Sequence, residues 1–235
     1  MANSTAAIIS NYLDTYQGRD KILRTLSYMA KLATGMTRSD DAATRFKKFG
    51  SELSGCRVML RLLDDIPNLH SAITYGLGAQ EPDWLIRCAE LLQITVHLFY
   101  GPIEHICWAG DRKIVAIDTK AWDSATIWCW IVSISLSLFK SIRRLQQLKN
   151  NKTCLDKSNC ESRIALKTIS SQRNSEILTS IRLILDVSYA VSYLPPGILW
   201  GGRLTTWQVG ALGTVSSLIG LYQSIHKEVA HQKHK

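Results

Sequence analysis

The residues that could carry out acid–base or thiol chemistry gather at one place in the sequence. Glu104, His105, Cys107 and Asp111 bring an acid, a base and a thiol close together, as hydrolytic and transfer enzymes require. No second cluster in the sequence completes a catalytic triad or a metal shell. A His beside a Glu at a helix end more often forms a structural hydrogen-bond pair, so we expect no catalytic residue and no enzyme.

The remaining candidates for cofactor or metal chemistry are equally weak. His226, His231 and His234 do not have the spacing of a zinc motif. No phosphate-binding glycine loop or dinucleotide fingerprint is present, and Gly201 and Gly202 are interpreted as packing residues. We therefore expect neither a metal nor a cofactor.

A different kind of site is indicated between Ala42 and Ile66, where apolar and basic residues separate on a helix. The apolar side is the expected membrane-inserting face: Phe46, Phe49, Leu53, Cys56, Leu60 and Leu63. The basic residues on the remaining surface are the expected contacts to lipid headgroups: Arg45, Lys47, Lys48, Arg57 and Arg61. Such a helix suits the core of a helical bundle or the surface of an anionic bilayer.

The composition limits the partners. The 235 residues are 46% hydrophobic and 20% charged, which excludes a mainly disordered chain. With 28 basic and 19 acidic residues the formal charge is +9, which favours an anionic partner. Signatures of RNA-binding modules and zinc fingers are missing, so an anionic membrane is favoured over nucleic acid. Six cysteines without a paired framework indicate reduced thiols.

The elements that position these residues are predicted to be helices. Residues 1–110 form an amphipathic helical region, with a break at Gly18, the helix 42–66 ended by Pro67, and a last helix stopped at Gly101-Pro102. Residues 111–123 are a linker. Residues 124–142 are a first transmembrane segment, because 16 uncharged residues are extended by Trp122 and a snorkelling Lys140. A buried strand or core helix is the alternative there.

The C-terminal part is predicted to be anchored in the membrane. A basic connector, 143–182, precedes an apolar segment, 183–203, that Pro195-Pro196-Gly197 interrupts. Residues 204–225 are uncharged and long enough for a second transmembrane helix, and 226–235 are a basic tail. Small residues on one face of the second span are the expected self-association site: Thr206, Gly210, Gly213, Ser217, Gly220 and Ser224. The chain is thus predicted to be an all-α integral membrane protein with amphipathic N-terminal helices and about two C-terminal transmembrane helices.

Short motifs spread over the chain carry a family resemblance. They are Gln17-Gly18-Arg19-Asp20-Lys21, Arg61-Leu62-Leu63-Asp64, Tyr75-Gly76-Leu77-Gly78-Ala79-Gln80-Glu81, Glu104-His105 before Trp108, and Gly197-Ile198-Leu199-Trp200. With them the chain resembles the peroxisomal membrane-elongating peroxins, the peroxisomal biogenesis factor eleven family. The last motif, with residues 210–223, resembles the gamma-type members.

The resemblance implies a multi-pass protein of the peroxisomal membrane with both termini in the cytosol. Such a protein tubulates the membrane ahead of peroxisome fission, associates with itself and with related peroxins, and helps to recruit fission machinery that includes a dynamin-like GTPase. The family's membrane-inserting helix matches the position of residues 42–66. The same topology places the connector in the lumen, against the positive-inside tendency.

Three other functions stay open at this point. One is a pore or metabolite channel, suggested by Ser133, Ser135 and Ser137 and by the paired apolar segments. Another is a helical adaptor that recruits fission proteins. The third is a soluble helical bundle that binds another protein.

Overall fold

The computed structural model describes the backbone of residues 2–154 and 160–232, and the side chains of residues 7, 9–151 and 166–229. All regular structure in these ranges is helical, so the all-α class is confirmed. The helices are α1 (Ala2–Asp14), α2 (Tyr16–Met36), α3 (Asp40–Arg61), α4 (Asp65–Tyr75), α5 (Trp84–Asp111), α6 (Lys120–Cys154), α7 (Cys160–Val191) and α8 (Thr206–Gln232). They form two compact units, Met1–Arg61 with Val191–Lys235, and Leu62–Ala190.

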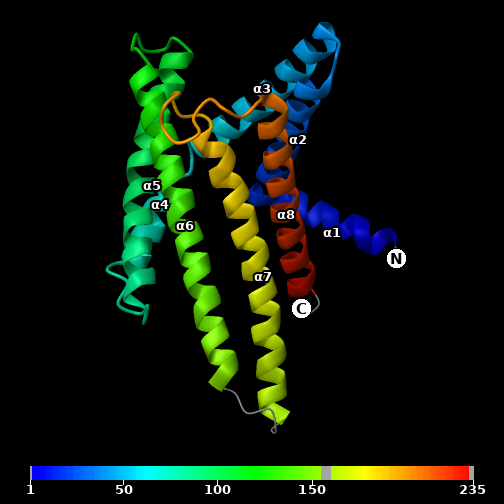
Figure 1. Ribbon diagram of the computed structural model, residues 1–235, viewed down its shortest axis with the longest axis vertical. Coiled ribbons are helices and arrows are strands. Elements are labelled where there is room, and N and C mark those ends of the chain that lie inside the picture. The colour runs from blue at the N-terminus through cyan, green and yellow to red at the C-terminus, as the bar shows by residue number, and fades with distance from the viewer. Residues whose placement is uncertain (1, 155–159, 233–235) are drawn as a thin grey trace. The chain divides into compact units, whose positions relative to one another are not determined.

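The first unit is built on the close approach of α2 and α8, which lie side by side (Figure 1). A Cβ atom added to Gly210 would lie 2.4 Å from the backbone nitrogen of Leu32. One added to Gly213 would lie 2.2 Å from Cδ1 of Tyr28, and one added to Gly35 would lie 2.4 Å from the backbone nitrogen of Trp207. Both helices therefore need glycine to bring their backbones this close.

α3 packs on the other side of α2. Ser27 Oγ donates a hydrogen bond to the carbonyl of Gly50 at 3.2 Å. The guanidinium of Arg57 donates twice to Asp20, from Nε at 2.7 Å and from Nη2 at 3.3 Å. This mostly buried, two-pronged ion pair fixes the register between α3 and α2.

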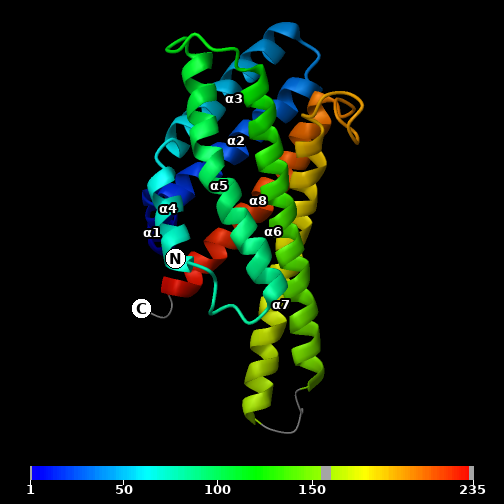
Figure 2. The same ribbon diagram turned by 90° about the vertical axis from the view of Figure 1, so that its left-hand side faces the viewer.

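The second unit contains α5 and α6, which run side by side in Figure 1 and Figure 2. α7 packs on α6 through Ser141, whose hydroxyl donates to Glu176 Oε2 at 2.7 Å and lies 3.0 Å from Ser180 Oγ. Further along, the rings of Trp130 and Tyr189 are 5.7 Å apart. α4 packs on α5.

The predicted helix 42–66 is divided in the structure. α3 ends at Arg61, a turn covers residues 62–64, and α4 begins at Asp65. Pro67 was expected to end a helix, but it lies in the first turn of α4. Proline fits there because the first amide groups of a helix have no partner inside the helix.

Two other helix breaks predicted from glycine and proline also differ from the structure. The first break falls at Thr15, whose hydroxyl accepts from the amide of Gly18 at 3.0 Å, so Gly18 lies inside α2. Gly101-Pro102 lies inside α5, which continues to Asp111. A Cβ on Gly101 would lie 2.0 Å from Asp65 Oδ1, so a larger residue there would displace the Asp65 side chain.

The predicted connector 143–182 is largely helical. α6 extends to Cys154 and α7 starts at Cys160, while residues 155–159 lie outside the described part. The predicted tail 226–235 continues α8 as far as Gln232, and residues 233–235 are not described. Ser, Asn, Gln and basic residues on an exposed helix surface resemble a loop in composition, so the sequence did not indicate these helical extensions.

One helical stretch in the described part of the chain is long and apolar enough to cross a membrane, residues Lys120–Asn151 of α6. It contains the predicted first span, 124–142. The predicted second span, 204–225, is helical from Thr206, but its apolar residues alternate with glycine, serine, threonine and glutamine. The number of spans therefore stays a prediction.

The glycine contacts predict the effect of a single methyl group. Gly210→Ala would raise intrinsic helix propensity by about 1 kcal/mol, yet it places a Cβ against the backbone of Leu32. We expect a net loss of about 1–3 kcal/mol from overpacking, measured as a lower melting temperature of the purified full chain by circular dichroism. Val215→Ala, on the exposed side of α8, is the matched control. An unchanged or higher melting temperature for Gly210→Ala would contradict this packing.

Candidate membrane-facing surfaces

The cluster at 104–111 serves packing within the second unit. Glu104 is buried and accepts a hydrogen bond from Tyr100 Oη at 2.9 Å. His105 Nδ1 lies 3.3 Å from Asp65 Oδ2, and its Nε2 lies 3.1 Å from the carbonyl of Leu62. His105 thus contacts the start of α4 rather than Glu104, and both side chains have structural partners.

The other candidate residues for chemistry have different surroundings from Glu104 and His105. Cys107 is buried, with Sγ 3.5 Å from Thr126 Oγ1 on α6, and Asp111 is exposed at the end of α5. His226 is exposed on α8, while the side chains of His231 and His234 lie outside the described residues. Within the described residues no group of three His, Cys, Asp or Glu side chains could hold a metal ion.

Some residues of the predicted membrane-inserting face are exposed in the structure, and others are partly buried against the protein. Phe46 and Phe49 are 42% and 51% exposed, and Cys56 is exposed as well. Leu53 and Leu60 are half-buried. Leu63 lies beyond the end of α3, in the turn before α4, and is exposed.

The basic residues predicted to contact headgroups divide in the same way. Arg45, Lys47 and Lys48 are exposed, and Arg45 Nη2 lies 2.9 Å from Asp41 Oδ2 one turn earlier. Arg57 is paired with Asp20, and Arg61 is half-buried. Only the first half of α3 therefore offers its cations outward.

α4 carries the most exposed apolar face of these two helices. Ile66 and Ile73 are 79% and 72% exposed, and Leu69 between them is exposed too. Their spacing of three and four residues puts them on one side of the helix. Leu77, just past its end, is also exposed. This spacing was visible in the sequence, but reading Pro67 as a helix end concealed it.

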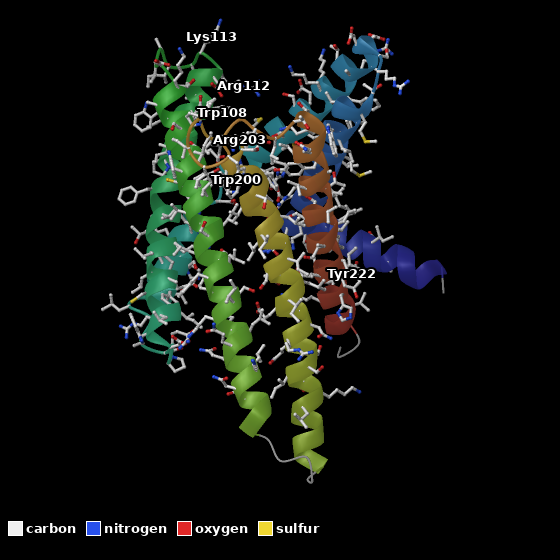
Figure 3. All side chains as sticks on the ribbon, viewed as in Figure 1. Trp108, Arg112, Lys113, Trp200, Arg203 and Tyr222 are labelled. Carbon is white, nitrogen blue, oxygen red and sulfur yellow. The ribbon has the colours of Figure 1, made fainter. Side chains whose placement is uncertain are left out.

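α6 combines an apolar outer face with a polar inner one. Trp128, Val132, Phe139 and Ile142 are exposed at helical spacing, and most of the apolar stretch is unburied. Trp108, Arg112 and Lys113 lie at the end of α5 (Figure 3), and the loop that follows exposes Ile114. Tryptophan and basic residues beside an apolar helix are typical of a membrane–water interface.

A seam of hydrogen bonds joins the inner face of α6 to α5. We define the polar seam as Asp83, Glu90, Gln93 and His97 with their partners on α6. His97 Nε2 lies 2.8 Å from Ser133 Oγ, Gln93 Nε2 donates to Ser137 Oγ at 3.1 Å, and the buried Lys140 donates to Glu90. Two of the serines that suggested a pore, at 133 and 137, therefore bond to α5. Such side-chain bonds hold helices together where lipid surrounds them.

Asp83 closes the polar seam at its end. Its Oδ1 accepts from the amide of Leu85 at 2.9 Å and caps α5. Its Oδ2 accepts from Arg143 Nε and from Gln147 Nε2, both at 2.7 Å. The hydrogen bond from Arg143 is the largest cause of a lowered pKa at the Asp83 carboxyl.

The small-residue face of α8 is occupied from within the chain. Gly210, Gly213 and Ser217 are buried, and Ser224 accepts a hydrogen bond from Lys21 of α2. Thr206 is exposed and Gly220 is half-buried. The helix that approaches this face in the single chain is thus α2, and self-association through it stays a prediction.

Exposed apolar helix faces, glycine contacts and a polar seam together define an all-helical, membrane-associated protein. Residues 7–225 match the family described as Peroxisomal biogenesis factor 11 (PEX11). The chain belongs to this family, a group of peroxins of the peroxisomal membrane that function in peroxisome biogenesis. The resemblance seen in the sequence motifs is confirmed.

The relatives support this membership over nearly the whole chain. Peroxisomal membrane protein 11C of Homo sapiens is 32% identical over 223 residues, covering 92% of each chain. The Mus musculus protein of the same name is 30% identical over 225 residues, covering 92% of this chain and 93% of its own. Peroxisomal membrane protein PMP27 of Saccharomyces cerevisiae matches 57% of each chain at 22% identity. No solved structure matches the chain.

The polar seam predicts an acid-sensitive contribution to stability. Because the pKa of Asp83 is lowered in the folded chain, its ion pair stabilises the fold above the ordinary value of 3.8 and is lost as the pH falls through the lowered one. Asp83→Asn keeps a capping oxygen but removes the charge. The melting temperature of this variant should lie below that of the wild type at neutral pH, and the gap should close in acid. A gap independent of pH would show that the charge does not contribute.

Proposed function

We propose that this chain elongates and tubulates the peroxisomal membrane ahead of fission and proliferation. Its amphipathic helices insert into one leaflet, and self-association concentrates them. Membership of the PEX11 family supports the organelle and the role in biogenesis. The observation that carries the mechanism is the exposed apolar face of Ile66, Leu69 and Ile73 on α4, directly after the cationic helix α3.

The apolar face supplies the larger part of the expected binding energy. Full burial of each Ile or Leu side chain would contribute about 1.5–3 kcal/mol, and less at a partly wet interface. Basic residues near an anionic surface add about 1 kcal/mol each. A helix lying about 5–10 Å deep widens one leaflet at the headgroups, so many copies curve the membrane.

α3 contributes the attraction to acidic lipid in this proposal. Arg45, Lys47 and Lys48 face outward and can contact headgroups, while Phe46 and Phe49 extend the apolar surface. Arg57 is engaged with Asp20 and acts structurally. α4 and the first half of α3 are thus each proposed to insert, as separate surfaces on the two units.

The proposal includes the family's topology and partners. α6 crosses the membrane, α8 provides a second span, both termini lie in the cytosol, and the basic connector, 143–182, faces the lumen. Copies of the chain associate with one another and with related peroxins, and the assembly recruits fission machinery with a dynamin-like GTPase. Because α2 fills the small-residue face of α8, self-association through that face requires α2 to move away.

Removing the apolar face of α4 tests the inserting surface. Ile66→Gln with Ile73→Gln should abolish tubulation of vesicles that contain phosphatidylserine, measured by electron microscopy on the reconstituted full chain. Both side chains are largely exposed, so the helix should still fold. Ser71→Gln with Thr74→Gln, exposed on the same helix outside the apolar face, is the matched control. Tubulation that survives the first pair undiminished would assign bending to another helix.

Neutralising α3 should have a different effect. Arg45→Gln with Lys47→Gln and Lys48→Gln should weaken tubulation and make it less dependent on phosphatidylserine, because these cations supply only the electrostatic part of binding. Lys227→Gln, an exposed cation on α8, is the control for a change in charge alone. An unchanged dependence on acidic lipid would exclude α3 as the headgroup-binding helix.

A further inference from the structure

The loop between α7 and α8 is a closed, hydrogen-bonded turn within the first unit. We define the 195–203 loop as Pro195 to Arg203. The amide of Gly202 donates to the carbonyl of Ser192 at 2.9 Å and so closes the loop at its base, while the amide of Gly201 donates to the carbonyl of Ile198 at 2.8 Å. Gly201 is buried, and a Cβ there would lie 2.5 Å from the carbonyl oxygen of Pro195. The loop therefore has a defined conformation.

This conformation presents apolar side chains outward. Leu199 is 66% exposed, and Ile198 and Trp200 beside it are exposed as well. Leu199 has a φ of +50°, in the left-handed region that a residue with a branched side chain rarely adopts. In water, Leu199 therefore carries two costs, the exposure of an apolar side chain and a strained backbone conformation. Backbone strain of this kind points to a function for the tip of the loop.

The one charged residue of the loop itself is Arg203. The sequence from Val187 to Lys227 contains no acidic residue. Arg203 is exposed at the end of the loop, where Figure 3 shows it with Trp200. On the neighbouring helix α2, Lys31 donates to Tyr193 Oη at 2.6 Å. The exposed Trp207 follows in the first turn of α8.

We propose that the 195–203 loop inserts into the interface of an acidic phospholipid bilayer. Ile198, Leu199 and Trp200 enter the boundary between headgroups and acyl chains, and Arg203 contacts lipid phosphate. Lipid fits this surface because the tip is apolar and small, tryptophans favour the interface, and the one charged residue of the loop, Arg203, is positive. The inference rests on the proposed membrane location but not on membrane bending.

The depth of position 199 in a bilayer tests this inference. A dansyl-bearing amino acid replaces Leu199 in the full chain, which keeps all six native cysteines, and the protein is reconstituted in vesicles of phosphatidylcholine and phosphatidylserine. We expect a blue-shifted emission that nitroxide-labelled lipids quench and that iodide in the buffer does not. The same amino acid at Asp14, an exposed acidic position at the opposite end of the α2–α8 pair, is the aqueous reference.

Each other outcome overturns the proposal. Quenching by iodide would place the tip in water. Protection from both quenchers would mean that protein covers it, as a second copy of the chain would. The Arg203→Gln variant should make the lipid quenching shallower and less dependent on phosphatidylserine, and an unchanged signal would remove Arg203 from the contact.

The same label separates this inference from the proposed function. It is placed in the Ile66→Gln, Ile73→Gln background as well as in the wild type. Lipid quenching at 199 without tubulation in either chain would preserve the loop contact and reject membrane bending. Tubulation without lipid quenching at position 199 would support membrane bending and reject the loop contact.

Discussion

The first unit depends on the distance between two backbones. α2 and α8 come together where Gly35, Gly210 and Gly213 have no side chain, and a single methyl group at any of these positions would collide with the facing helix. This contact joins residues near the start of the chain to residues near its end. The positions of α3, through Asp20 and Arg57, and of the 195–203 loop, through the start of α8, follow from it.

The second unit uses a different physical interaction. α5 and α6 are joined by side chains along the polar seam, where hydroxyl, amide, imidazole and charged groups satisfy one another. Both kinds of contact suit helices in lipid, where apolar side chains have no reason to leave their surroundings and only close packing and hydrogen bonds favour association. The apolar side chains are then left to face outward, as they do on α4 and α6.

Much of this arrangement was readable from the sequence, but the partners of each helix were not. The uncharged run in α6 and the small residues of α8 indicated helices that pack closely or meet lipid. The spacing of Gly210 and Gly213 does not show whether the approaching helix belongs to the same chain or to a second copy. A pattern on one helix does not identify its neighbour. Pro67 and Pro102 were read as helix ends, yet both lie in helices, since proline is tolerated in a first turn and tertiary packing can override a local preference. Arg57 was predicted to contact lipid, and its ion pair with Asp20 could not be foreseen, because the sequence does not show that the two side chains face each other.

The contact of α1 with both α2 and α8 has a topological consequence. α1 leads into the end of α2 that lies beside Ser224, close to where α8 finishes. Its 13 residues span about 20 Å. α1 and the last turns of α8 therefore lie at the same end of the α2–α8 pair, and a change in α1 would be felt where α8 finishes.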